Sequence, residues 1–311
     1  MPLKAPLDKD YRQTMPGSAS RRTMAILGAI FAVVVWGVSF IATKVALRDV
    51  SPVTVVWLRF AIGFIILGAA VRMRWQFSLP ARSDLGYFAL LGFLGITFHQ
   101  WLQSTGLQTA QATTTAWIVA TTPIFIALLG WLVLKERLRW VQTLGILLAT
   151  VGVLLVVTRG NLASLASGSF GEPGDFLILL SAPNWAVFSI LSRRGLRRFP
   201  ATLMMFYVMG FGWLFTMLLL FAGPGLSEIP NLTLPGWLGV IFLGVFCSGL
   251  AYIFWYDALQ ALPVAQAGAF VYLEPFVTLV VAALVLGEVV TLVSLLGGGV
   301  ILLGVWMVQR S

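Results

Sequence analysis

The stretch PIFIALLGWLVLKERL, residues 123–138, runs from a proline through a long apolar segment to three adjacent charges. A second stretch, PFVTLVVAALVLGEVV at residues 275–290, keeps the proline, the apolar run and the glutamate but has neither basic residue. The stretches are 152 positions apart. The same offset relates four glycines in two pairs, Gly145 with Gly297 and Gly152 with Gly304. The matching prolines, glutamates and glycines predict that the chain consists of two related halves.

The composition indicates that much of the surface faces lipid. Hydrophobic residues make up 59% of the chain and charged residues only 10%, whereas a soluble domain has nearer half apolar and a quarter charged residues. The apolar runs are about 20 residues long, the length that an α-helix needs to cross the hydrocarbon core. The predicted helices are 24–47, 53–72, 84–106, 111–134, 140–158, 175–193, 201–222, 236–257, 263–286 and 291–309.

We therefore expect an all-α polytopic membrane protein whose ten transmembrane helices form two inverted five-helix repeats. An odd number of helices in each half places the second half upside down in the membrane, an arrangement typical of transporters with a site near the midplane. The expected domains are a cytoplasmic tail at 1–23, an N-terminal repeat at 24–158, a linker at 159–174 and a C-terminal repeat at 175–311.

The basic residues predict the orientation. Sixteen of the 20 Lys and Arg residues fall on one side if the N-terminus is cytoplasmic, and cytoplasmic loops carry such an excess. We expect a multi-pass protein of the cell's inner (plasma) membrane with both termini in the cytoplasm. Lys135 and Arg137 fit this rule, and the turn around Glu288 lacks basic residues because it would lie outside.

Several motifs resemble those of a known family. The first predicted helix contains Trp36-Gly37-x-Ser39-Phe40-x-x-x-Lys44, the second contains Arg59-Phe60, and each half contains a proline, an apolar run, Leu-x-Glu and two spaced glycines. This set resembles the drug/metabolite transporter superfamily in its ten-helix EamA branch. The aromatic residues and the length are most similar to the bacterial aromatic amino acid exporters of that branch. The resemblance implies an efflux carrier for small metabolites that has no ATPase domain.

Polar and aromatic side chains recur at mid-helix depth, where contact with lipid would be costly. The segment HQWLQS places His99 and Gln103 on one helix face. The 152-residue offset relates Gln100 and Ser104 of the same segment to Tyr252 and Tyr256. Aromatic walls with a few polar anchors suit an amino acid, whose ammonium aromatic faces attract; alternatively, the polar residues only join helices. The candidate substrate-binding residues are Trp36, Phe40, Lys44, His99, Gln100, Trp101, Gln103, Trp117, Asn184, Trp185, Phe188, Tyr252, Tyr256 and Glu274.

The ionisable groups allow more than one interpretation. Glu274 is the deepest acid, and it is expected either to carry a proton or a substrate ammonium, or to bond to carbonyls freed by Pro275. Snorkelling toward the interface would account for Lys44 and Arg59, and solvation for Asp257. For the two related glutamates we expect a structural role, because a carboxylate in a turn can accept hydrogen bonds from the N–H groups that begin the next helix. These glutamates are Glu136 and Glu288.

Other functions are disfavoured. The chain has no G-x-x-x-x-G-K-[ST] loop for phosphates, and its single histidine and single cysteine make a metal site improbable. The basic residues form short clusters between apolar runs, which argues against a nucleic acid partner. We expect no enzyme activity, no cofactor and no metal, and a monomer or homodimer in the lipid bilayer. An intramembrane enzyme is a minor alternative.

The sequence as a whole predicts an alternating-access exporter of small metabolites, most of all amino acids including aromatic ones. Because ionisable groups in the helices are few and scattered, facilitated diffusion is favoured over proton exchange. The alternatives are a proton-coupled exporter of drug-like cations or other metabolites, and a membrane scaffold or sensor that transports nothing.

Overall fold

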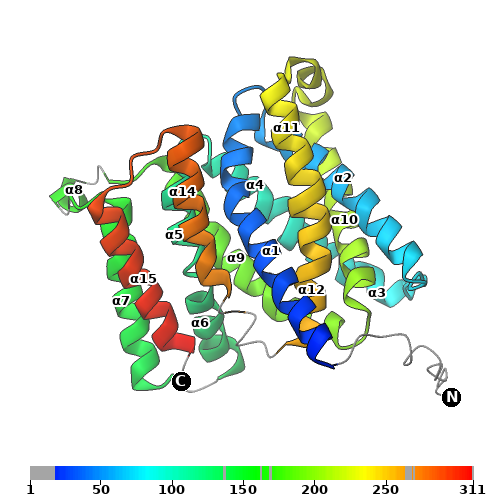
Figure 1. The fold of residues 1–311 in the computed structure, drawn as a ribbon, viewed down its shortest axis with the longest axis horizontal. Coiled ribbons are helices and arrows are strands. Elements are labelled where there is room, and N and C mark those ends of the chain that lie inside the picture. Colours follow the sequence, from blue (N-terminus) through cyan, green and yellow to red (C-terminus); the bar gives the residue numbers. More distant parts are fainter. Residues whose placement is uncertain are drawn as a thin grey trace.

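The apolar runs form helices that lie side by side in one bundle (Figure 1). The computed structural model describes residues 18–135, 138–161, 163–167, 170–262, 268 and 270–309. Regular secondary structure in this part of the chain is entirely helical. Glu136, one of the two related glutamates, lies outside the described residues, as does most of the expected N-terminal tail.

The described residues of the first half form eight helical elements, several of which combine into longer membrane-length helices. They are α1 (Ser18–Ala46), α2 (Pro52–Met73), α3 (Arg82–Gly92), the π-helical η2 (Phe93–Phe98), α4 (His99–Gly106), α5 (Ala112–Val119), α6 (Thr122–Leu134) and α7 (Trp140–Val157). A short helix, α8 (Ala163–Ser167), follows in the expected linker.

The second half has a similar order, with two 3-10 helices among the described elements in addition. Its elements are α9 (Pro173–Leu196), α10 (Ala201–Ala222), the 3-10 helix η3 (Gly225–Asn231), α11 (Leu234–Phe242), the π-helical η4 (Leu243–Leu250), α12 (Ala251–Ala261), the 3-10 helix η5 (Val271–Leu273), α14 (Glu274–Leu286) and α15 (Leu292–Gln309).

The membrane-length helices agree closely with the expected ones. Within the described residues, nine segments are long and apolar enough to cross a membrane. A shorter apolar helix at Val271–Leu286 stands where the expected ninth helix, 263–286, ends. The prediction of a polytopic all-α membrane protein is thereby confirmed.

The two quoted stretches end in the same way. Helix α6 ends at Lys135, which has a left-handed backbone with φ of 55°, and α14 ends at Gly287 with φ of 67°. These residues are equivalent under the 152-residue offset. Glycine adopts this conformation without steric cost, whereas a lysine is disfavoured there. The backbone turn is therefore shared by both halves even though the residue types differ.

The matched glycines mark a close helix crossing. Helices α7 and α15 make the most extensive contact in the fold and stand together at one edge of the bundle (Figure 1). A Cβ atom on Gly145 would lie 2.6 Å from the carbonyl oxygen of Gly304, and one on Gly152 would lie 2.7 Å from that of Gly297. The offset exchanges these two contacts with each other, so α7 and α15 pack as equivalent helices of an inverted pair.

The π-helical segments also repeat. The offset carries η2, residues 93–98, onto 245–250, which lies inside η4. A π segment leaves backbone carbonyls without their usual α-helical partners and is frequent at functional sites. Both segments lie in the middle of membrane-length helices, at Arg82–Gly106 and Leu234–Ala261.

Polar contacts join the halves at opposite ends of α2. At its N-terminal end, the Glu228 carboxylate accepts hydrogen bonds from the Ser51 N–H and the Thr54 hydroxyl, each at 2.8 Å. At its C-terminal end, Arg74 forms a bidentate ion pair with Asp257 at 2.8 and 2.7 Å. The expectation that Asp257 is only solvated is therefore wrong.

Replacement of Gly145 by alanine tests the helix crossing. The added Cβ would collide with backbone of α15, and we expect a loss of about 1–3 kcal/mol of stability, which is typical of overpacking. Gly299→Ala is the matched control, because a Cβ there meets nothing within 4 Å and alanine favours the helix. Thermal unfolding in detergent measures the difference. Equal transition temperatures for the two variants would contradict this packing.

The Glu228 contact predicts a pH dependence of stability. Burial opposes ionisation of this carboxyl group, but hydrogen bonds from Ser51 and Thr54 outweigh burial and lower its pKa. Its contribution should be complete above the unfolded-state pKa of about 4.3 and be lost as the pH falls through the lower folded-state pKa. We expect Glu228→Gln to lower the thermal transition temperature at pH 7. The difference in transition temperature between this variant and the wild type should shrink as the pH falls. A difference that is constant with pH would contradict the assignment.

Candidate functional site

One buried cluster brings together side chains from both halves of the chain. Its members come from α2, α3, α9, α10 and α12 together with η2, and α1 packs against them. Five of the candidate substrate-binding residues belong to this cluster or pack directly on it: Trp36, Trp185, Phe188, Tyr252 and Tyr256.

The first aromatic group joins α1 to α12. The ring of Trp36 meets that of Tyr252 edge to face at a centroid distance of 5.9 Å, and Tyr252 stacks on Tyr256 at 6.2 Å. The two tyrosines share a helix face because they are four residues apart. The indole N–H of Trp36 donates to the carbonyl oxygen of Cys247 in η4 at 3.2 Å, which fixes the orientation of the ring.

The second aromatic group joins α4 to α9. His99 and Trp185 have ring centroids 4.6 Å apart, and Trp185 and Phe188 have centroids 4.8 Å apart. Asn184 donates from its side-chain amide to the carbonyl oxygen of Leu94 in η2 at 2.8 Å. Asn184 and Trp36 thus make equivalent contacts, because each donates a hydrogen bond from one half to a carbonyl oxygen in the π segment of the other half.

A polar link connects the neighbourhoods of these two groups. Arg59 in α2 donates from Nε to the Ser248 hydroxyl at 3.0 Å and from Nη1 to the Gln100 side-chain oxygen at 3.1 Å. The arginine is only 5% exposed, so the expectation that it snorkels to the interface is wrong. The sequence contained a signal for Arg59 and Ser248, namely polar residues in otherwise apolar membrane helices, but it did not show that they meet.

Two aromatic candidates lie away from this cluster. Trp117 in α5 packs against α15, where its indole N–H donates to the Ser294 hydroxyl at 3.2 Å and its ring fills the space above Gly298. Phe40 belongs to a separate cluster that includes Leu107 of the α4–α5 connection. Tight helix packing accounts for both positions.

Three further candidates have other surroundings. Trp101 stacks on Phe98 at a centroid distance of 6.3 Å, and Phe98 in turn stacks on the exposed Phe93. Gln103 is buried in α4. Lys44, near the end of α1, donates from Nζ to the carbonyl oxygen of Ala110 at 2.5 Å and so bonds to the break between α4 and α5.

Glu274 is a buried acid at the start of α14. It is 9% exposed, and none of the ion pairs among the described residues involves it. Pro275 stands in the first turn of the helix, where its missing N–H breaks no intrahelical hydrogen bond. The structure therefore does not support the expectation that Pro275 frees carbonyls for this carboxyl group.

Glu288 stabilises a helix end in the opposite half. Its carboxylate accepts hydrogen bonds from the N–H groups of Ala112 and Thr113 at 2.7 and 3.0 Å, and from the Thr113 hydroxyl at 2.8 Å. These N–H groups begin α5 and have no partners within the helix. The expected capping role is present, but the helix that Glu288 caps is α5 and not the following α15.

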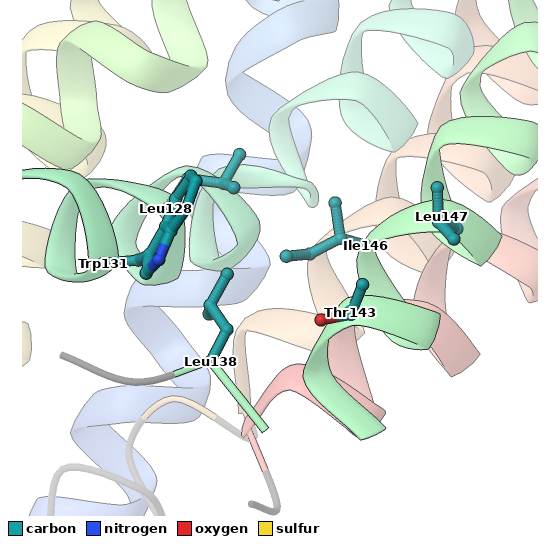
Figure 2. A pocket seen from close by; sticks show the side chains of 6 residues that line it. All are labelled: Leu128, Trp131, Leu138, Thr143, Ile146 and Leu147. Atoms are coloured by element: carbon teal, nitrogen blue, oxygen red, sulfur yellow. The ribbon is translucent and has the colours of Figure 1, made fainter. Parts of the chain in front are cut away.

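A hollow on the surface lies apart from the candidate residues. It has a volume of about 550 Å³ and opens between α6 and α7, with side chains such as Trp131 and Ile146 around it (Figure 2). Its lining is largely apolar and includes Trp131 and Leu147, which are also exposed. None of the candidate substrate-binding residues lines it.

These features define an integral, polytopic α-helical membrane protein with matching π segments and helix crossings in its two halves. The chain belongs to the EamA-like transporter family, whose profile matches residues 23–158 and 172–310. Together the two matched segments cover most of the chain. Membership of this family indicates that the protein is a membrane transporter.

Proteins that are similar to this chain over nearly its full length have names that describe them as transporters. An uncharacterised transporter of Archaeoglobus fulgidus is 26% identical over 88% of this chain and 93% of its own. A protein of Streptantibioticus cattleyicolor named a probable terminal-alkyne amino-acid exporter is 28% identical over 92% of this chain and 93% of its own. A crystal structure with a TM-score of 0.64 covers 92% of this chain and 96% of its own. At 22% identity this last likeness concerns the fold alone.

Removal of the Glu288 cap should destabilise the protein. We expect Glu288→Ala to cost about 0.5–2 kcal/mol, the usual range for a lost helix cap, because two N–H groups of α5 lose their acceptor. Glu288→Gln retains one acceptor oxygen and should lose less. Thermal unfolding in detergent compares the two variants. If both variants unfold at the wild-type temperature, the cap contributes nothing to stability.

Proposed function

We propose that the protein exports amino acids, including large aromatic ones, across the cytoplasmic membrane by alternating access. The observation that carries this proposal is the buried junction where two aromatic groups each join side chains of both halves. One group is Trp36 with Tyr252 and Tyr256, and the other is His99 with Trp185. Aromatic faces suit a large side chain and attract an ammonium group. One relative named as an amino-acid exporter supports the same substrate class.

The division into two repeats supports the proposed mechanism. We place the repeats at 24–158 and 175–311, joined by the linker at 159–174, and the family profile matches two segments of similar extent. A site at the junction of two inverted halves can open to each side in turn as the halves rock. The basic residues favour cytoplasmic termini, and the glycine faces of α7 and α15 pack within one chain, which requires no second copy.

We propose that transport proceeds by facilitated diffusion, driven by the concentration gradient of the substrate. Charged groups within the membrane-length helices are few, and Arg74 and Asp257 neutralise each other in an ion pair. Buried Glu274 favours the second candidate function, a proton-coupled exporter of cationic compounds, because a buried carboxyl group can carry a proton or bind a cation. A transport assay separates these two functions.

Uptake into proteoliposomes tests the function. We expect labelled phenylalanine to exchange across the membrane without an imposed pH gradient, and Glu274→Gln to retain this exchange. Phenylalanine flux that requires a pH gradient and is lost in Glu274→Gln would favour the proton-coupled alternative. Intact protein that moves no amino acid would overturn the proposal.

Two tryptophans provide a matched test of the site. Trp185 contacts His99 and Phe188 inside the junction, whereas Trp131 is 47% exposed at the hollow of Figure 2. We expect Trp185→Ala to lower kcat/KM for phenylalanine by about tenfold, the effect of about 1.4 kcal/mol. Trp131→Ala should leave it unchanged. Equal effects of the two substitutions would show that the site lies elsewhere.

A further inference from the structure

Arg59 is a fixed positive charge inside the bundle. It lies seven residues after the first residue of α2, which places it about 10 Å along the helix axis, and it is 5% exposed. A guanidinium group keeps its proton in proteins. The side chain therefore carries its charge among buried neighbours and cannot escape the cost by deprotonation.

The partners described for this charge are neutral. Nε donates to the Ser248 hydroxyl and Nη1 donates to the Gln100 side-chain oxygen. The ion pairs among the described residues belong to three other arginines, Arg74, Arg159 and Arg198. A buried charge is costly unless an opposite charge accompanies it. Two dipolar acceptors orient the guanidinium but do not balance its charge.

The chemistry of the guanidinium fits a carboxylate. Its planar fork presents parallel N–H donors that match the two oxygens of a carboxylate, with a geometry that lysine cannot supply. Lys44, the other basic candidate, donates to the carbonyl oxygen of Ala110 near the end of α1. Arg59 is thus the better placed of these two basic side chains for an anion at the junction.

The acceptors of Arg59 stand in the same helical elements as residues of the aromatic groups, or directly next to them in sequence. Ser248, Tyr252 and Tyr256 follow one another at four-residue intervals through η4 and α12, and Gln100 adjoins His99 in α4. In an aromatic amino acid such as phenylalanine, the two carbons Cα and Cβ separate the carboxylate from the aromatic ring. A cation flanked by aromatic side chains has the arrangement that such a molecule requires.

We infer that Arg59 binds the carboxylate of the transported amino acid, which replaces Gln100 and Ser248 as acceptors of its N–H groups. This inference rests on the proposed function and adds the group that selects carboxylate-bearing substrates. The exchange also has a consequence for the halves. Ser248 belongs to the second half and Arg59 to the first, so a bound carboxylate would release one hydrogen bond between them.

Binding to the purified full-length protein tests the inference. The ligands are L-phenylalanine and L-phenylalaninamide, which keeps the ring and the ammonium but has no carboxylate; tryptophan fluorescence reports their binding. We expect the wild type to bind phenylalanine at least tenfold more tightly than the amide. Arg59→Gln should abolish this preference by weakening phenylalanine alone. Arg48→Gln, the matched control at an exposed arginine just after α1, should retain it.

The outcomes separate the inference from the proposed function. A wild type that binds neither ligand refutes the proposed function and the inference with it. A wild type that binds both ligands equally, or an Arg59→Gln variant that keeps the preference, overturns the inference alone. Equal weakening of both ligands by Arg59→Gln shows a structural role and also overturns it. If Arg59→Gln does not fold, Arg59→Lys replaces it, and unchanged phenylalanine binding by that variant counts against the inference.

Discussion

The fold depends on how backbone polar groups are satisfied where water is absent. Hydrocarbon offers them no partner, so a membrane helix can depart from α geometry only where protein groups replace the lost hydrogen bonds. Each π segment receives such a group from the other half, because Trp36 donates to Cys247 in η4 and Asn184 donates to Leu94 in η2. At the start of α5, Glu288 has the same function for two N–H groups. The irregular backbone at the centre of the molecule is thus held by contacts between the halves.

The polar contacts at the two ends of α2 concern the proposed alternating-access mechanism. Ser51 and Thr54 bind Glu228 at one end of α2, Arg74 binds Asp257 at the other, and both contacts cross between the halves. Alternating access requires that one end opens while the other stays closed. Polar contacts of this kind can part and re-form with little net cost where water reaches them, whereas the crossing of α7 and α15 is packed through backbone atoms. In the proposed alternating-access mechanism, the ends of α2 would separate in turn while α7 and α15 would stay together.

Much of the fold could be predicted from the sequence, and much less of the site. Helix ranges follow from the length of apolar runs, which is a local signal. The recurring glycines predicted two related halves, but the structure alone shows that they meet in the α7–α15 crossing. The partner of a side chain depends on which helices become neighbours. Trp117 and Trp185 were both candidate substrate-binding residues, yet Trp117 packs against α15 while Trp185 lies at the junction. Likewise, Glu288 was expected to cap the following helix, but its acceptors face α5.

The sequence by itself determined the helices, the two halves and the class of protein, because hydrophobic length, proline and glycine positions and charge distribution act within a few residues of the chain. Only the tertiary structure decided which polar groups meet. Arg59 shows the difference. An arginine near a helix end predicts snorkelling, since the long side chain can reach water at little cost. The packing of α2 against α4 and η4 instead turns the guanidinium inward to Gln100 and Ser248, because acceptors from distant parts of the chain are placed within its reach.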